Sequence, residues 1–283
     1  MTGARAARDG VPGAGRAPAP EPLPAAALDA HCHLDLIEEP TGEVLAAARA
    51  AGITRVITVG VDVPSSRWSA DRADPGQGVY AAVAVHPNET AAAASSSAQR
   101  DEVLAEIAKL AALPQVRAVG ETGLDYYRDY SPRAQQRDWF RAHIDIAKQA
   151  GKALMIHDRD AHDDVLAILA ADGPPERVVF HCFSGDAAMA KRCAAAGYVM
   201  SFAGNLTFAN APALRDAAAA APADLLLVET DAPFLTPVPY RGKPNTPAMV
   251  AYTVRCLAEV KHLAVADMCA SVTATGARMF GPW

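Results

Sequence analysis

The stretch Leu28-Asp29-Ala30-His31-Cys32-His33-Leu34-Asp35 combines a short apolar run with two histidines separated by one residue. It predicts a strand that ends at the histidine pair. Successive side chains of a strand point to opposite faces, so His31 and His33 share one face while Cys32 points to the other. Two imidazoles on one face are typical of part of a metal site. The remaining ligands must therefore come from other parts of the chain.

The chain repeats one unit from this stretch onward: an apolar run, a polar loop and a helical stretch. Predicted strands cover Ala26–Asp29, Arg55–Val59, Val79–Val85, Val116–Val119, Ala153–Ile156, Arg177–Phe180, Tyr198–Phe202 and Leu225–Val228. Predicted helices cover Glu43–Ala51, Ser65–Ala73, Ala98–Leu113, Pro132–Ala150, Ala161–Ala171, Asp186–Ala196, Ala211–Ala220, Thr246–Val260 and Ala266–Met279. Several runs are continuous in Val, Ile and Leu, which is typical of parallel strands buried on both faces.

This alternation of eight strands with helices over 283 residues predicts an α/β fold, a (β/α)8 TIM barrel. An open doubly wound sheet is the alternative. That fold would more often carry a glycine-rich phosphate loop after its first strand, and the sequence has none there. We therefore expect a single barrel domain over residues 27–283.

The first 26 residues consist mainly of Ala, Gly, Pro and Arg and contain almost no large apolar side chains. Such a segment cannot bury enough surface to offset the entropy that is lost when a chain becomes ordered. We therefore expect a disordered tail over residues 1–26. It lacks the apolar central run of a secretory signal.

The overall charge and the cysteines argue against several classes of protein. The net charge of −6 disfavours a protein that coats nucleic acid through a generally basic surface. The five cysteines form no Cys-x-x-Cys pair and are odd in number, which disfavours a disulfide framework and indicates a reducing, cytoplasmic setting. No apolar run is long enough to span a bilayer. We expect a cytoplasmic monomer with no membrane contact.

Titratable residues follow most of the predicted strands. In a TIM barrel, the catalytic and ligand-binding residues lie at these C-terminal strand ends. They are His31 and His33 after the first strand, His86 after the third, Glu121 after the fourth, His157 after the fifth, His181 after the sixth and Asp231 after the eighth. Five of the eight histidines occupy such positions. Packing explains one such histidine easily, but titratable groups gathered on one rim are what a metal site requires.

Four of these histidines and the two carboxylates are too many ligands for one ion that keeps an open position. They suit two neighbouring divalent cations that share a carboxylate and a water. The expected ligands are His31, His33 and Asp231 for one ion, His157 and His181 for the other, and Glu121 as the bridge. Such ligands suit Mg²⁺, Mn²⁺ or Zn²⁺, and the sequence leaves the choice open. Divalent ions acidify water, and Asp231 could take its proton as general base.

Five motifs occur in chain order on this predicted rim. They are His31-x-His33, Gly120-Glu121-x-Gly123-Leu124-Asp125, His157-Asp158-Arg159-Asp160, His181-Cys182-Phe183-Ser184-Gly185 and Glu229-Thr230-Asp231-Ala232-Pro233. Together they resemble the TatD family of metal-dependent deoxyribonucleases, which belongs to the amidohydrolase-like barrel superfamily. The resemblance covers about residues 28–280 and implies a TIM barrel, divalent metals on the matching residues and hydrolysis of DNA phosphodiesters, often as a 3′–5′ exonuclease. Many amidohydrolase relatives use a modified lysine where Glu121 stands, which favours the nuclease branch.

Two positions depart from the pattern of this family. Asp158 stands where Cys or Asn is more usual, and an extra acidic group there could alter metal preference or phosphate affinity. In the stretch 239–247, which resembles the closing loop of the family, Thr246 stands where a glutamate is common. Neither residue is among the expected ligands.

Candidate substrate contacts lie in the loops around the rim. We expect His86 to contact a phosphate oxygen or the leaving group. Arginine binds phosphate with two parallel hydrogen bonds, and this local basic set would offset the acidic chain. The candidates for phosphate contact are Arg128, Arg159, Arg241 and Lys243. The candidates for stacking on the bases of an unpaired end are Tyr126, Tyr127 and Phe183, and for Phe183 the sequence favours a role in core or loop packing.

Three functions compete at this point. The leading hypothesis is a two-metal phosphodiesterase that acts on single-stranded or frayed DNA ends, with Asp231 and Glu121 as catalytic residues. The second keeps the metal site but changes the bond to an ester or amide, as in an aminoacyl-tRNA deacylase or a lactonase-like enzyme. The third is a barrel that only binds nucleic acid or a partner. The intact set of metal ligands argues against this third hypothesis.

Overall fold

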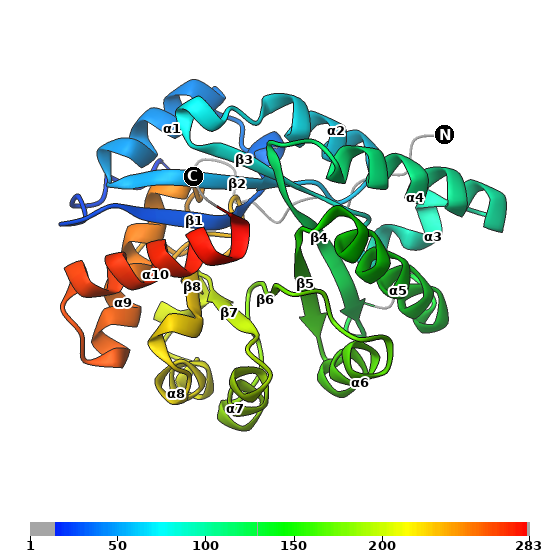
Figure 1. Ribbon diagram of the computed structural model, residues 1–283. Coiled ribbons are helices and arrows are strands. Elements are labelled where there is room, and N and C mark those ends of the chain that lie inside the picture. Colours follow the sequence, from blue (N-terminus) through cyan, green and yellow to red (C-terminus); the bar gives the residue numbers. More distant parts are fainter. Residues whose placement is uncertain (1–14, 129, 282–283) are drawn as a thin grey trace.

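Parallel strands form the centre of the protein. The computed structural model describes residues 15–128 and 130–281, and these contain one eight-stranded sheet in which neighbours pair in chain order (Figure 1). The strands are β1 (Ala27–Cys32), β2 (Ile53–Val59), β3 (Val79–Val83), β4 (Val116–Asp125), β5 (Ala153–Arg159), β6 (Val178–Phe180), β7 (Val199–Phe202) and β8 (Leu226–Val228). Each predicted strand is present, and the bounds differ mainly at the C-terminal ends of β1, β4 and β5.

Helices connect the strands and cover the outer face of the sheet (Figure 1). They are α1 (Thr41–Ala50), α2 (Val63–Arg72), α3 (Thr90–Ala93), α4 (Ser97–Ala111), α5 (Arg133–Ala150), α6 (His162–Asp172), α7 (Ala187–Ala195), α8 (Pro212–Ala220), α9 (Val250–Lys261) and α10 (Val265–Phe280). The short helix α3 is an addition to the predicted set. Within the described ranges, no helix has both the length and the apolar character needed to cross a membrane.

The ring of strands closes between the loop after β8 and the end of β1. The Asp231 backbone N–H donates to the His31 carbonyl over 2.9 Å, and the His33 N–H donates to the Ala232 carbonyl over 2.8 Å. Cys32 and Ala232 also form an isolated parallel bridge. The predicted (β/α)8 TIM barrel is therefore confirmed, and the open doubly wound sheet is excluded.

Side chains on both faces of the strands are buried. All six residues of β1 and all five residues of β3 are buried, because helices cover the outside and side chains fill the interior. The largest buried side chains include Trp139 and Phe140 of α5, Phe180 of β6 and Phe202 of β7. This packed core fixes the strand ends, and the strand ends position the polar residues on the rim.

Strands β4 and β5 extend beyond the apolar runs that predicted them. Their pairing continues from Thr122 opposite Ile156 to Asp125 opposite Arg159. Gly123 allows this close pairing, because it has φ +138° and an added Cβ would lie 2.1 Å from the His157 carbonyl oxygen. The extension is rich in polar residues, so the apolar runs in the sequence place the ends of both strands too early.

The segment before β1 packs against the barrel. Leu23 is buried, and its backbone N–H donates to the Ala51 carbonyl over 3.0 Å. The Arg255 side chain of α9 donates to the carbonyls of Glu21 and Pro22 over 2.8 and 3.2 Å. The predicted disorder is therefore wrong for residues 21–26, since one leucine and several backbone carbonyls provide contacts that the average composition does not reveal. Residues 1–14 of the predicted tail lie outside the described residues.

Candidate metal centre

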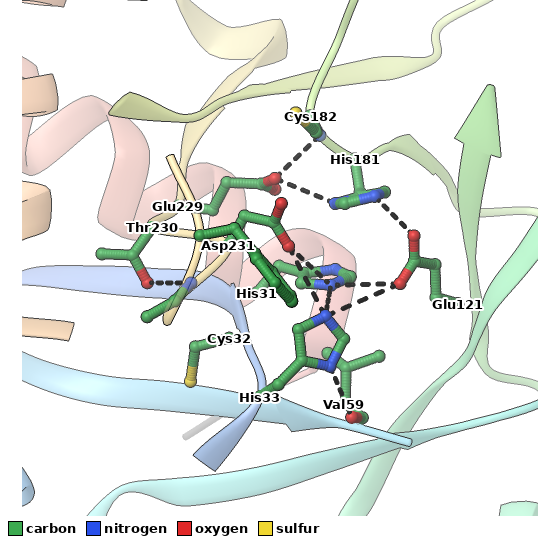
Figure 2. Close-up of polar contacts among 12 residues, drawn as sticks. His31, Cys32, His33, Val59, Glu121, His181, Cys182, Glu229, Thr230 and Asp231 are labelled. Carbon is green, nitrogen blue, oxygen red and sulfur yellow. Dashed lines mark hydrogen bonds and ion pairs between the residues drawn. The ribbon is translucent and has the colours of Figure 1, made fainter. Parts of the chain in front are cut away.

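The six predicted ligands converge at the C-terminal ends of the strands. They come from β1 or the residue after it (His31, His33), from β4 (Glu121), from β5 (His157), and from the loops after β6 (His181) and β8 (Asp231). Five of them are shown in Figure 2, where Glu121 and Asp231 approach the histidine pair from opposite sides. Cys32 points away from this cluster, as the alternation along β1 predicts, and its thiol donates to the Ile57 carbonyl.

Four side chains form the first cluster: His31, His33, Glu121 and Asp231. The Nε2 atoms of the two histidines are 3.3 Å apart. Glu121 Oε2 lies 3.5 and 3.8 Å from these two nitrogens, and Asp231 Oδ1 lies 3.8 and 3.5 Å from them. Ligands at 2.0–2.1 Å from a tetrahedral zinc ion lie about 3.4 Å from one another. His31, His33 and Glu121 therefore have the spacing of a metal site, and Asp231 lies beside the two histidines as a further candidate donor.

Glu121, His157 and His181 form the second cluster. Glu121 Oε1 lies 2.6 Å from His157 Nδ1 and 2.8 Å from His181 Nε2. The first cluster faces the other oxygen, Oε2, so Glu121 presents one carboxylate oxygen to each cluster. The donor set of two imidazoles and one carboxylate suits a second divalent cation.

Carboxylates lie behind two of these histidines. His181 Nδ1–H donates to Glu229 Oε1 over 2.9 Å, and the same oxygen accepts from the Cys182 backbone N–H over 2.8 Å. His157 Nε2 lies 3.3 Å from Asp125 Oδ2. Such outer carboxylates are typical of metal-binding histidines. Glu229 begins one of the five motifs and Asp125 ends another, but nothing in the sequence reveals that each lies behind a histidine.

Outer contacts also orient the histidine pair of β1. His33 Nδ1–H donates to the Val59 carbonyl over 3.0 Å, and His31 Nδ1 lies 3.1 Å from the Met155 sulfur. Both rings therefore turn their Nε2 atoms toward Glu121.

A buried aspartate joins the first strand to the loop after the last. Asp29 accepts hydrogen bonds from the Thr230 backbone N–H over 2.8 Å and from the Thr230 hydroxyl over 2.5 Å. The next residue, Asp231, has φ +53°, a left-handed conformation that is rare for residues other than glycine. The Asp29–Thr230 pair helps to hold Asp231 in this conformation, beside His31.

The electrostatics of the cluster keep its carboxylates ionised. Burial opposes the charged form of Glu121, but the positive charge of His181 and the hydrogen bonds from His157 and His181 hold the Glu121 pKa well below its usual value. Burial likewise opposes the charged form of His33, but Asp231 outweighs it and raises the His33 pKa to about 9. Cations that bind here would displace such protons.

His86 lies closer to the ligand cluster than expected. Its Nε2 is 3.4 Å from Glu121 Oε1, and its Nδ1 accepts the Asn88 backbone N–H over 3.0 Å. Burial lowers the pKa of His86, which favours the neutral ring. Because Nδ1 accepts, Nε2 carries the proton of that neutral ring. His86, Glu121 and His157 form a group with metal-site spacing, but the His86 Nε2 atom is placed as a hydrogen-bond donor.

The predicted phosphate-binding arginines lie on the rim, where their guanidinium groups stack over aromatic rings. Arg159 lies 4.1 Å from the ring centroid of Tyr127, Arg241 lies 4.0 Å from that of Phe208, and Arg128 lies 6.0 Å from that of Tyr130. The predicted Lys243 is also near a ring, that of Tyr240 at 5.9 Å.

The three candidate stacking residues lie in different surroundings. Tyr127 is exposed, whereas the Tyr126 hydroxyl is 2.5 Å from an Asp164 carboxylate oxygen. Phe183 is buried against Phe202, with ring centroids 5.7 Å apart, so it packs in the core instead of facing the rim.

A sequence model of the family described as TatD related DNase matches residues 28–281. The chain belongs to this family. It is 44% identical over 263 residues to the Mycobacterium tuberculosis protein named uncharacterized metal-dependent hydrolase TatD, covering 90% of this chain and 97% of that protein. It is 37% identical over 257 residues to the Bacillus subtilis protein named uncharacterized metal-dependent hydrolase YabD, covering 89% and 98%. Its structure is similar to that of the TatD homologue YJJV from Escherichia coli, with a TM-score of 0.82 and 27% identity over 90% of this chain and 97% of that chain.

The two departures from the TatD pattern lie away from the ligand cluster. The carboxylate of Asp158 is buried on the face of β5 opposite to His157, where it accepts a hydrogen bond from His162 Nδ1 over 2.8 Å. Thr246 is buried at the start of the short 3-10 helix Pro247–Met249, and its side chain makes no capping bond there. Its neighbour Asn245 instead donates to the carbonyls of Thr230 and Phe234.

Proposed function

We propose that this metal-dependent hydrolase of the TatD family cleaves phosphodiester bonds in DNA, acting as a 3′–5′ exonuclease on single-stranded or frayed ends. The observation that carries the proposal is the placement of Glu121, whose two oxygens face two clusters of imidazole and carboxylate ligands. Sites with two neighbouring cations suit phosphodiester cleavage, since both the attacking and the leaving oxygen can be stabilised.

Two divalent cations would be held by the six converging side chains. His31, His33 and Asp231 would hold one, His157 and His181 the other, and Glu121 would contact both. Mg²⁺, Mn²⁺ and Zn²⁺ all suit such ligands. When bound, the ions supply Lewis acidity and lower the pKa of water.

Asp231 is the residue best placed to accept a proton from the attacking water. Hydrogen bonding to His33 and the nearby imidazole charges outweigh burial and lower the Asp231 pKa, so the carboxylate is ionised at neutral pH. Its side chain keeps some exposure, in contrast to the fully buried His31 beside it. An ionised carboxylate within reach of water can serve as general base.

His86 and the rim arginines would orient the phosphate. The Nε2–H of His86 points into the site and can donate to a phosphate oxygen or to the leaving oxygen. Arg128, Arg159 and Arg241 would bind neighbouring phosphates through paired hydrogen bonds. DNA is favoured over a carbonyl substrate because the family description names DNases and because these arginines suit phosphates.

Digestion of single-stranded DNA labelled at the 3′ or the 5′ end tests the proposal. We expect hydrolysis with added Mg²⁺ or Mn²⁺, none after EDTA treatment, and a loss of about 100- to 1000-fold in Glu121→Gln, the scale of removing one key electrostatic group. Activity that survives EDTA or the substitution contradicts the mechanism. Hydrolysis of aminoacyl esters or lactones without any cleavage of DNA would favour the carbonyl alternative.

A further inference from the structure

Two exposed aromatic side chains, Phe234 and Tyr127, stand on opposite sides of the mouth of the barrel. We propose that they stack on unpaired bases on either side of the phosphodiester that is cleaved. This inference rests on the proposed action on DNA. It assigns the recognition of a single-stranded end to two residues outside the metal ligands.

The position of each residue in the ring of strands places them across the site. Tyr127 follows β4 and Phe234 lies in the loop after β8. Because the sheet has eight strands in chain order and closes on itself, β4 and β8 lie on opposite sides of the ring. Tyr127 is 62% exposed and Phe234 is 45% exposed, whereas most large apolar side chains of the described residues are in the core.

Phe234 is held beside the first cluster. Its backbone N–H donates to the Asp231 carbonyl over 2.8 Å, and its carbonyl accepts a hydrogen bond from the Asn245 side chain. Its ring centroid lies 6.2 Å from that of His33, with the two planes inclined at 70°. An aromatic surface next to a proposed metal ligand is therefore fixed by backbone contacts and remains open to a ligand.

Tyr127 is held beside the second cluster in a similar way. Its backbone N–H donates to Asp125 Oδ1 over 3.0 Å, and the other oxygen of Asp125 lies 3.3 Å from His157 Nε2. The Arg159 guanidinium lies 4.1 Å from the centroid of the Tyr127 ring. This places a positive charge for a phosphate next to a ring that can stack on the adjoining base.

The chemistry of the pair selects for unpaired bases. Stacking on an aromatic side chain needs a free base face, which a paired and stacked duplex does not offer, and it tolerates any base. Each such contact strengthens binding of single-stranded DNA by about 10- to 100-fold. A DNA strand that has the same phosphates but lacks the bases at its end would gain no binding affinity from Phe234 or Tyr127.

The test compares two single-stranded oligonucleotides, one with normal ends and one whose last nucleotides are abasic. We expect Phe234→Ala and Tyr127→Ala each to lower kcat/KM on the normal strand by about 10- to 100-fold and to leave cleavage of the abasic strand unchanged. Tyr127→Phe keeps the ring and should keep most of the activity. Leu263→Ala is the control, since Leu263 is also exposed but lies between α9 and α10, away from the mouth.

Three results would overturn the inference. Unchanged cleavage of the normal strand by both alanine variants would show that the rings do not contact bases. Equal losses on both strands would assign the rings to the structure of the rim. Equal cleavage of the two strands by the unmodified protein would exclude base stacking. If the unmodified protein cleaves neither strand, the proposed action on DNA fails instead.

Discussion

Individual carboxylates behind the candidate metal ligands help to position the histidines around Glu121. Glu229 orients His181 over 2.9 Å, and Asp125 lies 3.3 Å from His157. Functional residues of a TIM barrel lie at the C-terminal ends of its strands, and this rule predicts from the sequence that Glu121, the histidines and Asp231 belong to the site. It cannot distinguish a ligand from a residue behind a ligand, because both are carboxylates at strand ends. Their roles differ in the structure because Asp231 Oδ1 lies near the Nε2 atoms of His31 and His33, whereas Glu229 Oε1 accepts a hydrogen bond from His181 Nδ1.

Glu229→Gln tests the role of the outer carboxylates. The change removes the charge behind His181 while keeping the shape of the side chain, so we expect metal affinity to fall by about 10- to 100-fold with the fold intact. Competition with a chelator of known affinity measures the effect. Glu259→Gln is the matched control, because Glu259 is exposed on α9. Equal affinity in the two variants would refute a role for Glu229 in metal binding.

His143 provides a prediction about pH that is separate from the metal site. It is buried, donates from Nδ1 to the Trp139 carbonyl over 2.8 Å and accepts the Val85 N–H at Nε2 over 3.1 Å. Burial lowers its pKa to about 4, from 6.5. The unfolded chain therefore binds this proton at higher pH than the folded chain does. Stability should fall by about 3 kcal/mol as the pH drops from about 6.5 to about 4.

Denaturant titrations at pH 7.5 and pH 4.5 check this expectation. The unmodified protein should lose more stability between the two values than His143→Gln, which has no proton to gain. Other titrating groups are the same in both proteins and cancel in the comparison. An identical loss in the two proteins would mean that His143 does not contribute to the pH dependence.

The extension of β4 and β5 is the element that brings the second cluster together. Apolar runs predict the buried parts of these strands because both faces there are covered. Beyond Val119 and Ile156 the two strands carry mainly polar residues, among them Glu121 and His157. The apolar runs in the sequence therefore end there, although the pairing of the strands continues. The sequence therefore predicts Glu121 and His157 as candidate ligands but places them after the strands instead of on them.

Gly123→Ala tests whether this pairing positions His157. An added Cβ would lie 2.1 Å from the His157 carbonyl oxygen, and φ +138° disfavours any side chain. We expect a lower Tm and loss of about one bound cation from the second cluster. Gly42→Ala on α1 is the control, since a Cβ there meets no atom within 4 Å and should stabilise the helix by about 0.5 kcal/mol. Normal metal content in Gly123→Ala would contradict this role.

The whole barrel includes the segment before β1, which the sequence composition does not reveal. One leucine anchors it, and carbonyl groups bound by α9 and α10 hold the backbone. Carbonyl groups carry no sequence signal, so composition alone predicts a tail through Ala26. The alternation of strands and helices, by contrast, depends on many residues and identifies the barrel correctly.

Leu23→Ala tests the contribution of this segment to the stability of the whole molecule. Loss of the buried side chain should lower the free energy of unfolding by about 2 kcal/mol. Metal content should stay unchanged, because Leu23 contacts the chain near Ala51 and not the rim. Glu21→Ala is the control, since the Glu21 side chain is exposed and its carbonyl is retained. Equal stability of the two variants would show that the packing of Leu23 is unimportant.

Anomalous diffraction from crystals grown with Mn²⁺ shows directly whether Glu121 contacts two cations. We predict two peaks per chain that share Glu121, one beside His31, His33 and Asp231 and the other beside His157 and His181. A single peak, or peaks that do not contact Glu121, would contradict the claim that this carboxylate bridges two cations.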